Sequence, residues 1–267
     1  MRRASVLVGV ITVLALGMVL GCSPAAKTGM LEFRANGEDF VRQGFVSKDG
    51  WTIAFDHVYV TLTEVTAYQT SPPYDPLSGG NIESKGKISL SGTHTVDLAE
   101  GGGDADPILV GEVGNAPVGQ YNAISWKMVK AKDGPSTGYS LLVDGTAAKD
   151  GQKVDFEIKV ESEYGYACGE YVGDERKGIL KAGETSDLEM TFHFDHIFGD
   201  ADTPPDDELN VGAVGFEPFA GAASGGRLVS DMIGLESALS ESDFQALVDI
   251  LPTLGHVGEG HCHCDSH

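Results

Sequence analysis

Basic side chains are scarce in this chain of 267 residues. Lysine and arginine together number 18, against 40 aspartate and glutamate residues, and the formal net charge is −22. Such a surface repels phosphate and cannot gain from counterion release, so the composition excludes a nucleic-acid-binding protein. Hydrophobic residues still make up 41% of the chain. That fraction excludes an intrinsically disordered polyanion and allows a sizeable core.

Sequence signatures of catalysis are also lacking. The chain contains no Gly-x-Ser-x-Gly, no His-Glu-x-x-His and no phosphate-binding glycine loop. The sequence therefore predicts a protein that is not an enzyme. A zinc-dependent hydrolase is the third interpretation, because histidines can supply three zinc ligands and leave one position open for water.

Long hydrophobic runs are absent except near the start of the chain. Arg2 and Arg3 precede the uncharged run 4–20, an arrangement typical of a secretory signal. The run ends in Val19-Leu20-Gly21-Cys22, which resembles the lipobox of bacterial lipoproteins. A plain transmembrane anchor is the alternative. The resemblance implies a signal peptide over residues 1–21, a lipid on Cys22 that attaches the chain to the membrane through a tether over 22–30, and an extracytoplasmic place on the outer membrane or cell surface.

Residues 31–210 are predicted to form a β domain, because apolar residues recur with a period of two between frequent Gly, Pro, Asn and Asp residues. Val154, Phe156, Ile158 and Val160, for example, alternate with charged residues. We expect a mainly β fold, an antiparallel β-sandwich of the immunoglobulin or transthyretin-like kind.

After residue 210 the pattern changes, and residues 211–255 are predicted to form a helical or irregular extension. Ser240 with Asp243 is typical of a helix N-cap, and an apolar stripe at helical spacing follows and stops at Pro252. The stripe is formed by Phe244, Leu247, Val248 and Leu251. Residues 256–267 form a separate His- and Cys-rich tail.

The tail holds four of the eight histidines and two of the three cysteines other than Cys22. In an extended chain His261 and His263 share one face, and Cys262 and Cys264 share the other. Imidazole and thiolate are ligands for zinc and copper. Two other interpretations stay open: a disordered scavenger of loose metal, or a disulfide from Cys262 or Cys264 to Cys168.

A second histidine cluster lies at residues 193–200. On a strand His193 and Asp195 would share a face, whereas a bulge or a strand end at Asp195 would let His193 and His196 face one ion. Asp195 or Asp200 would then orient a ligand. Taken alone, His196 and His57, each in a Phe-Asp-His tripeptide, are interpreted as core histidines.

The acidic stretch that follows is a weaker candidate for calcium. Its oxygen ligands would be Asp200, Asp202, Asp206 and Glu208. The stretch does not match an EF-hand, so a solvated acidic loop is the alternative.

The chain resembles a group of uncharacterised secreted bacterial lipoproteins. The matching pieces are His57-Val58-Tyr59-Val60-Thr61-Leu62, Pro117-Val118-Gly119-Gln120-Tyr121, His193-x-Asp195-His196-x-Phe198-x-Asp200 and Gly258-Glu259-Gly260-His261-Cys262. The resemblance implies the β fold and the lipid anchor, and it implies no mechanism.

Together these patterns predict a lipid-anchored extracytoplasmic protein that binds a transition-metal ion for acquisition, storage or tolerance. Zinc is the first choice and Cu⁺ the second. The predicted ligands and their supports are His193, His196, His261, His263, Cys262, Cys264, Asp195 and Asp200. The alternative is a structural or ligand-binding cell-surface module without a functional metal, in which Cys168 is bonded to the tail.

Overall fold

The computed structural model describes residues 27–266, so the predicted signal peptide and Cys22 lie outside the described residues. The strands are β1 (Thr28–Asn36), β2 (Phe45–Val46), β3 (Thr52–Gln69), β4 (Gly86–Ser89), β5 (Thr93–Asp97), β6 (Ile108–Pro117), β7 (Gly119–Gln120), β8 (Ala123–Met128), β9 (Leu141–Lys149), β10 (Gln152–Val160), β11 (Tyr164–Cys168), β12 (Ile179–Leu180), β13 (Thr185–Phe192), β14 (Arg227–Asp231), β15 (Gly255–Val257) and β16 (Gly260–Ser266). The helices are α1 (Glu38–Gln43), α2 (Asp195–Phe198), α3 (Glu208–Gly212), α4 (Glu217–Ala222), α5 (Met232–Ala238) and α6 (Glu241–Ile250), with short 3-10 turns η1 (Pro76–Ser78) and η2 (Leu251–Thr253).

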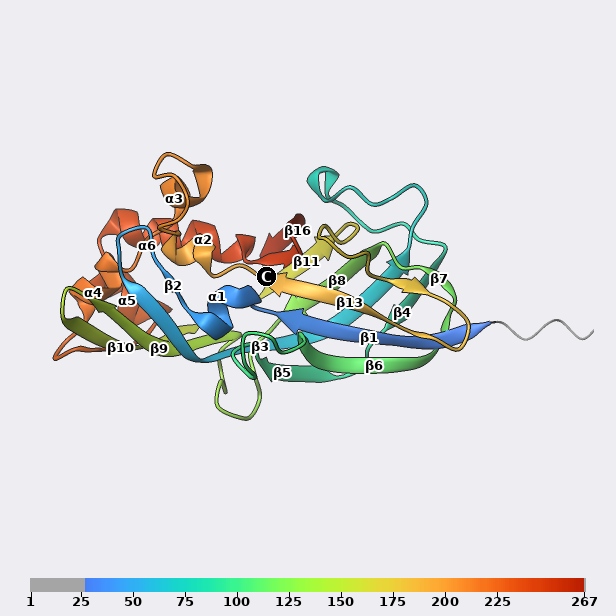
Figure 1. Cartoon of the computed structure of the whole chain (residues 1–267), viewed down its shortest axis with the longest axis horizontal. Coiled ribbons are helices and arrows are strands. Elements are labelled where there is room, and N and C mark those ends of the chain that lie inside the picture. The colour runs from blue at the N-terminus through green and yellow to red at the C-terminus, as the bar shows by residue number, and fades with distance from the viewer. Residues whose placement is uncertain (1–26, 267) are drawn as a thin grey trace, which may run out of the picture.

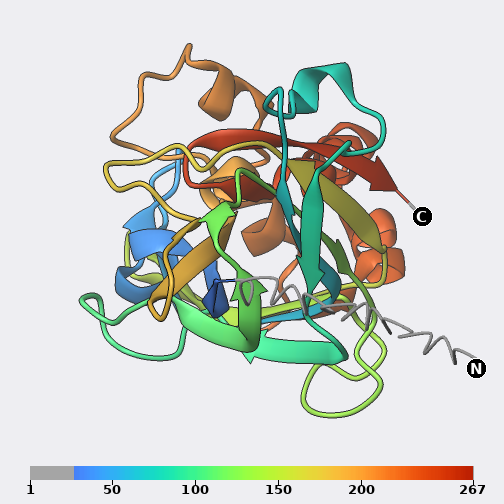
Figure 2. The same ribbon diagram turned by 90° about the vertical axis from the view of Figure 1, so that its right-hand side faces the viewer.

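The prediction of a mainly β fold is confirmed, but the strands do not form two antiparallel layers. Fourteen strands join one mixed sheet that curls into a half-barrel (Figures 1 and 2). Two pairings are parallel, β1 with β13 and β10 with β14. The period-two pattern gives strands in either arrangement, because it reports which face is buried and not which neighbour a strand pairs with.

The apolar alternation accounts for the core of the half-barrel. Val154, Phe156, Ile158 and Val160 of β10 are all buried, as the alternation predicts. Aromatic rings from distant segments meet them: Phe156 lies 5.2 Å from Phe216 and 6.2 Å from Phe55 between ring centres. Such ring pairs stabilise a core beyond the area that they bury.

Helices α2 to α6 gather over one half of the sheet, on the left in Figure 1. The predicted N-cap of α6 is confirmed, since Ser240 Oγ accepts a hydrogen bond from the backbone N–H of Asp243. Of the apolar stripe, Leu247 and Leu251 are buried, whereas Val248 is partly exposed. None of the described helices combines the length and the apolar character needed to cross a lipid bilayer.

The sheet does not end near residue 210, because β14, β15 and β16 also belong to it. β15 pairs with the end of β13, where His256 lies opposite Thr191. β16 pairs with β11 and is tied to it by the disulfide Cys168–Cys262. The C-terminal tail is therefore an integral part of the sheet and is held on both sides.

Candidate metal centre

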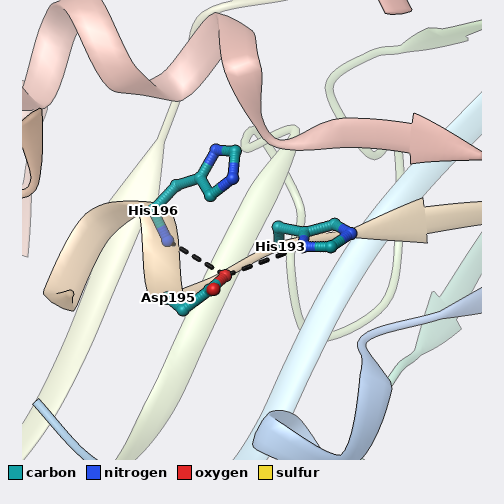
Figure 3. A group of neighbouring side chains, drawn as sticks. All are labelled: His193, Asp195 and His196. Carbon is teal, nitrogen blue, oxygen red and sulfur yellow. Dashed lines mark hydrogen bonds and ion pairs between the residues drawn. The ribbon is translucent and has the colours of Figure 1, made fainter. Parts of the chain in front are cut away.

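The 193–196 segment lies where β13 ends and α2 begins. The backbone N–H of His193 donates to the carbonyl of Leu254, and the chain turns into α2 at Asp195. The strand ends before Asp195, so the alternation of side chains between the two faces of a strand does not extend to His196. This is the strand-end arrangement that the sequence left open. The ligand atoms of His193, Asp195 and His196 lie within 4.8 Å of one another (Figure 3). These three residues form a group that could hold a metal ion.

Hydrogen bonds set the protonated nitrogen of His196. Its Nδ1 lies 3.0 Å from Oγ1 of Thr253, and that hydroxyl donates its only hydrogen to the carbonyl of Ile250 at 2.8 Å. The hydroxyl must accept from His196, so Nδ1 carries the hydrogen and Nε2 keeps its lone pair. A histidine held this way is prepared to bind a metal through Nε2.

His193 is held from its other nitrogen. Its Nε2 lies 3.2 Å from the carbonyl of Gly258 and 3.5 Å from a carboxylate oxygen of Glu38, so Nε2 donates. Nδ1 then faces Oδ1 of Asp195 at 3.8 Å. Two acceptors that face each other leave a favourable place for a cation. The same oxygen of Asp195 also accepts the backbone N–H of His196 at 3.1 Å.

Burial shapes the electrostatics of the group. Desolvation, followed by the nearby His193 and His261, lowers the pKa of His196 to about 4. Desolvation likewise lowers the pKa of His256 to about 3 and raises the pKa of Asp195. His196 and His256 are thus neutral at pH 7, which is the form that binds a metal.

Two residues of this region are not among those that the sequence predicts for the site: His256 and Thr253. The His256 ring centre lies 4.2 Å from that of His193, 5.0 Å from that of His196 and 4.7 Å from that of His261. The signal that could have found His256 is the two-residue turn Gly258-Glu259, since a hairpin there places residue 256 opposite residue 261.

Two glycines let the C-terminal hairpin that carries His256 pack closely against neighbouring segments. Gly258 has a φ of +57°, and a Cβ there would lie 2.0 Å from the carbonyl oxygen of Val172. A Cβ on Gly255 would lie 2.5 Å from the ring of Tyr166. A larger residue at either position would displace the hairpin from Val172 or Tyr166.

The two other predicted histidines of the tail have different positions. His261 is exposed at the outer side of the histidine group, next to His256. The imidazole of His263 instead lies near Gly79, and its Nε2 is 3.4 Å from Asp265. His263 is not brought to His193, because β16 carries it past the group to β11.

Neither predicted sulfur ligand is available as a thiolate at this site. Cys262 is bonded to Cys168, one of the two pairings that the sequence left open. Cys264 is not in a disulfide, but it packs against Tyr166, and burial raises the pKa of its thiol to about 12. The predicted sulfur ligation of the ion is therefore corrected, because Cys262 is in the disulfide and β16 places Cys264 opposite Tyr166 of β11, outside the His193 group.

Asp200 and the acidic stretch that follows it are not brought to the His193 group. Asp200 accepts hydrogen bonds from the backbone of Asp202 at 3.0 Å and from the hydroxyl of Thr203 at 3.3 Å, which shape a local turn. Among residues 27–266, the His193 group is the only set of three His, Cys, Asp or Glu residues whose ligand atoms converge. Asp200, Asp202, Asp206 and Glu208 form no such set, and calcium binding by this stretch stays a prediction.

The core interpretation of His57 is also wrong. Its side chain is 50% exposed, and its Nδ1 lies 2.7 Å from Asp97.

No known protein family, curated protein or solved structure matches this chain. The functional conclusion therefore depends on the geometry of the metal centre.

Proposed function

We propose that this protein binds a transition-metal ion at His193, Asp195 and His196 and serves metal acquisition, storage or tolerance outside the cytoplasm. The observation that carries the proposal is the convergence of the three ligand atoms within 4.8 Å at the junction of β13 and α2. The hydrogen bonds of His193 and His196 add support, because each ring uses one nitrogen as a donor and keeps the other free.

The donor set favours zinc as the ion. Two imidazoles and a carboxylate suit Zn²⁺, which accepts mixed nitrogen and oxygen ligands. Paired thiolates would favour Cu⁺, but Cys262 is in the disulfide and Cys264 lies outside the His193 group. The strongly acidic composition would raise the local concentration of any divalent cation.

The proposed location rests on the N-terminal pattern and on the disulfide. Arg2, Arg3, the apolar run and Cys22 support a lipid anchor and export, and the Cys168–Cys262 disulfide fits an oxidising compartment. Detergent phase partitioning tests it: we expect the native chain in the detergent phase and the Cys22→Ser variant in the aqueous phase. Equal partitioning of both would contradict a lipid on Cys22.

The same disulfide also favours the rival function, a structural surface module whose tail is merely fastened to the sheet. Elemental analysis of the purified, tag-free protein separates the two. We expect about one zinc ion per chain after dialysis against zinc, and far less in the His193→Ala variant, since that variant loses an imidazole ligand of the site. His94→Ala is the matched control, because His94 lies on β5 and contacts Ser91. A metal-free native protein would support the surface module instead.

A further inference from the structure

His256 has one satisfied ring nitrogen and one unsatisfied ring nitrogen. Its Nε2 lies 3.0 Å from the carbonyl of Thr253. A carbonyl only accepts, so Nε2 carries the hydrogen and Nδ1 has a lone pair. Nδ1 is fully buried and has no hydrogen-bond partner in the described part of the chain. A buried acceptor without a partner costs about 1 to 3 kcal/mol, so its retention calls for an explanation.

The surroundings of this nitrogen point to a ligand. The ring is only 3% exposed and contacts His193 and His196, the two imidazoles of the proposed site. With Zn–N bonds of about 2.0 to 2.1 Å and tetrahedral angles, imidazoles that share one zinc have ring centres roughly 5 Å apart. The three separations among His193, His196 and His256 are 4.2, 5.0 and 5.4 Å.

We propose that Nδ1 of His256 is the fourth protein ligand of the ion, in a closed site of three nitrogens and one oxygen. This inference rests on the proposed function. The ligand atoms that already converge are those of the triad alone, so the proposal requires a movement of the His256 ring towards the ion on binding. Four protein ligands fill a tetrahedral zinc site and leave no position for a reacting water, which fits binding and not catalysis.

Thr253 is a positioning residue of this site. Its carbonyl accepts from Nε2 of His256 and its hydroxyl accepts from Nδ1 of His196. One residue of η2 thereby selects the ligating nitrogen of two histidines from different segments of the chain. Outer contacts of this kind change metal affinity by about 10- to 100-fold when they are removed.

The test combines affinity with a count of bound imidazoles. Zinc affinity is measured by competition with a chromophoric chelator, and X-ray absorption of the zinc complex counts the histidine ligands. We expect three imidazoles in the native protein and two in His256→Ala, with a loss of affinity above about 100-fold. His263→Ala is the matched control, because His263 is in the same tail but lies near Gly79. It should leave both readouts unchanged.

His256→Asn keeps the proposal falsifiable if His256→Ala does not fold, because the amide fills part of the space of the ring and supplies no imidazole, so the count should again fall to two. A further pair of variants tests the positioning role of the Thr253 hydroxyl, which holds His196. Thr253→Val should weaken zinc binding about 10- to 100-fold, whereas Thr253→Ser should restore the native affinity. A merely structural threonine would lower stability in the metal-free protein without changing affinity in the folded fraction.

Three outcomes are decisive. Native affinity and three imidazoles in His256→Ala, together with loss of binding in His193→Ala, would overturn this inference and leave the proposed function standing. A native protein that binds no zinc would overturn both. Loss of one imidazole in His261→Ala but not in His256→Ala would assign the fourth position to His261 and refute the role of His256.

Discussion

The tripeptide Phe-Asp-His occurs twice, at residues 55–57 and at residues 194–196, and the two copies differ in their surroundings. The phenylalanines meet, since the ring centres of Phe55 and Phe194 are 6.1 Å apart in the same core. The two histidines lie in different environments. His57 is half exposed on β3 and contacts Asp97, whereas His196 lies on α2 beneath the C-terminal segment.

The difference shows that local sequence places the apolar residue but does not decide the chemistry of the histidine. His57 gains a carboxylate partner, and the hydrogen bond to Asp97 raises its pKa. His196 gains a hydroxyl and other imidazoles in a buried place, and desolvation lowers its pKa. The first environment favours a cationic ring, and the second favours a neutral ring with a free lone pair.

The largest expected effect is a loss of zinc affinity when the histidine of the 194–196 copy, but not that of the 55–57 copy, is replaced. His196→Ala removes one of the ligands in the triad, so we expect zinc affinity to fall by more than about 100-fold, since even contacts outside the ligand set change affinity by up to that factor. His57→Ala should leave affinity unchanged, because His57 contacts Asp97 and does not belong to the His193 group. Isothermal titration with zinc gives both values. Equal losses in the two variants would indicate a general effect on folding and would remove the contrast between the copies.

The second effect is on the free energy of unfolding, through the disulfide that fastens the C-terminal hairpin next to the 194–196 copy. Cys168 and Cys262 are 94 positions apart in sequence and join β11 to β16, the second strand of the hairpin. Replacing both by serine should lower the free energy of unfolding by about 2 to 5 kcal/mol, because the unfolded chain is no longer constrained. Urea denaturation under non-reducing conditions measures the change. Cys264→Ser is the control, with a smaller loss; a double variant as stable as the native protein would contradict the prediction.

The smallest effect is on the pH dependence of stability, and it has opposite signs for the two histidines. The pKa of His196 is about 4 in the folded protein against an ordinary 6.5. The unfolded chain therefore binds more protons between these values, and stability falls as the pH decreases through this window. Between pH 6.5 and 5 the loss from His196 is up to about 2 kcal/mol.

For His57 the folded pKa is raised, so its contribution is present below pH 6.5 and is lost as the pH rises through the folded value. Because the ring is half exposed, solvent screening limits this contribution to roughly a few tenths of a kcal/mol. Urea titrations of metal-free protein at pH 5 and 7.5 test both. We expect His196→Gln to flatten the pH dependence and His57→Gln to steepen it slightly. Changes in the same direction would refute the sign assigned to one of them.

Much of the fold follows from local patterns. Alternation of apolar residues places β10, and the pair Ser240 and Asp243 places the start of α6, because both signals act within one element. The arrangement of strands does not follow from such signals. The parallel pairings of β1 with β13 and of β10 with β14 join residues more than 60 positions apart, and alternation is the same for either orientation.

The candidate site divides in the same way. The sequence by itself determined that imidazoles are concentrated at residues 193–196 and 256–263, that Cys168 is available to pair with a cysteine of the tail, and that the chain is acidic. Only the tertiary structure decided which of these groups meet. The end of β13 and the hairpin β15–β16 bring His193, His196 and His256 together, while pairing with β11 carries His263 and Cys264 away. Coordination depends on distances between side chains of segments remote in sequence, and those distances are set by backbone pairing and burial of the whole sheet.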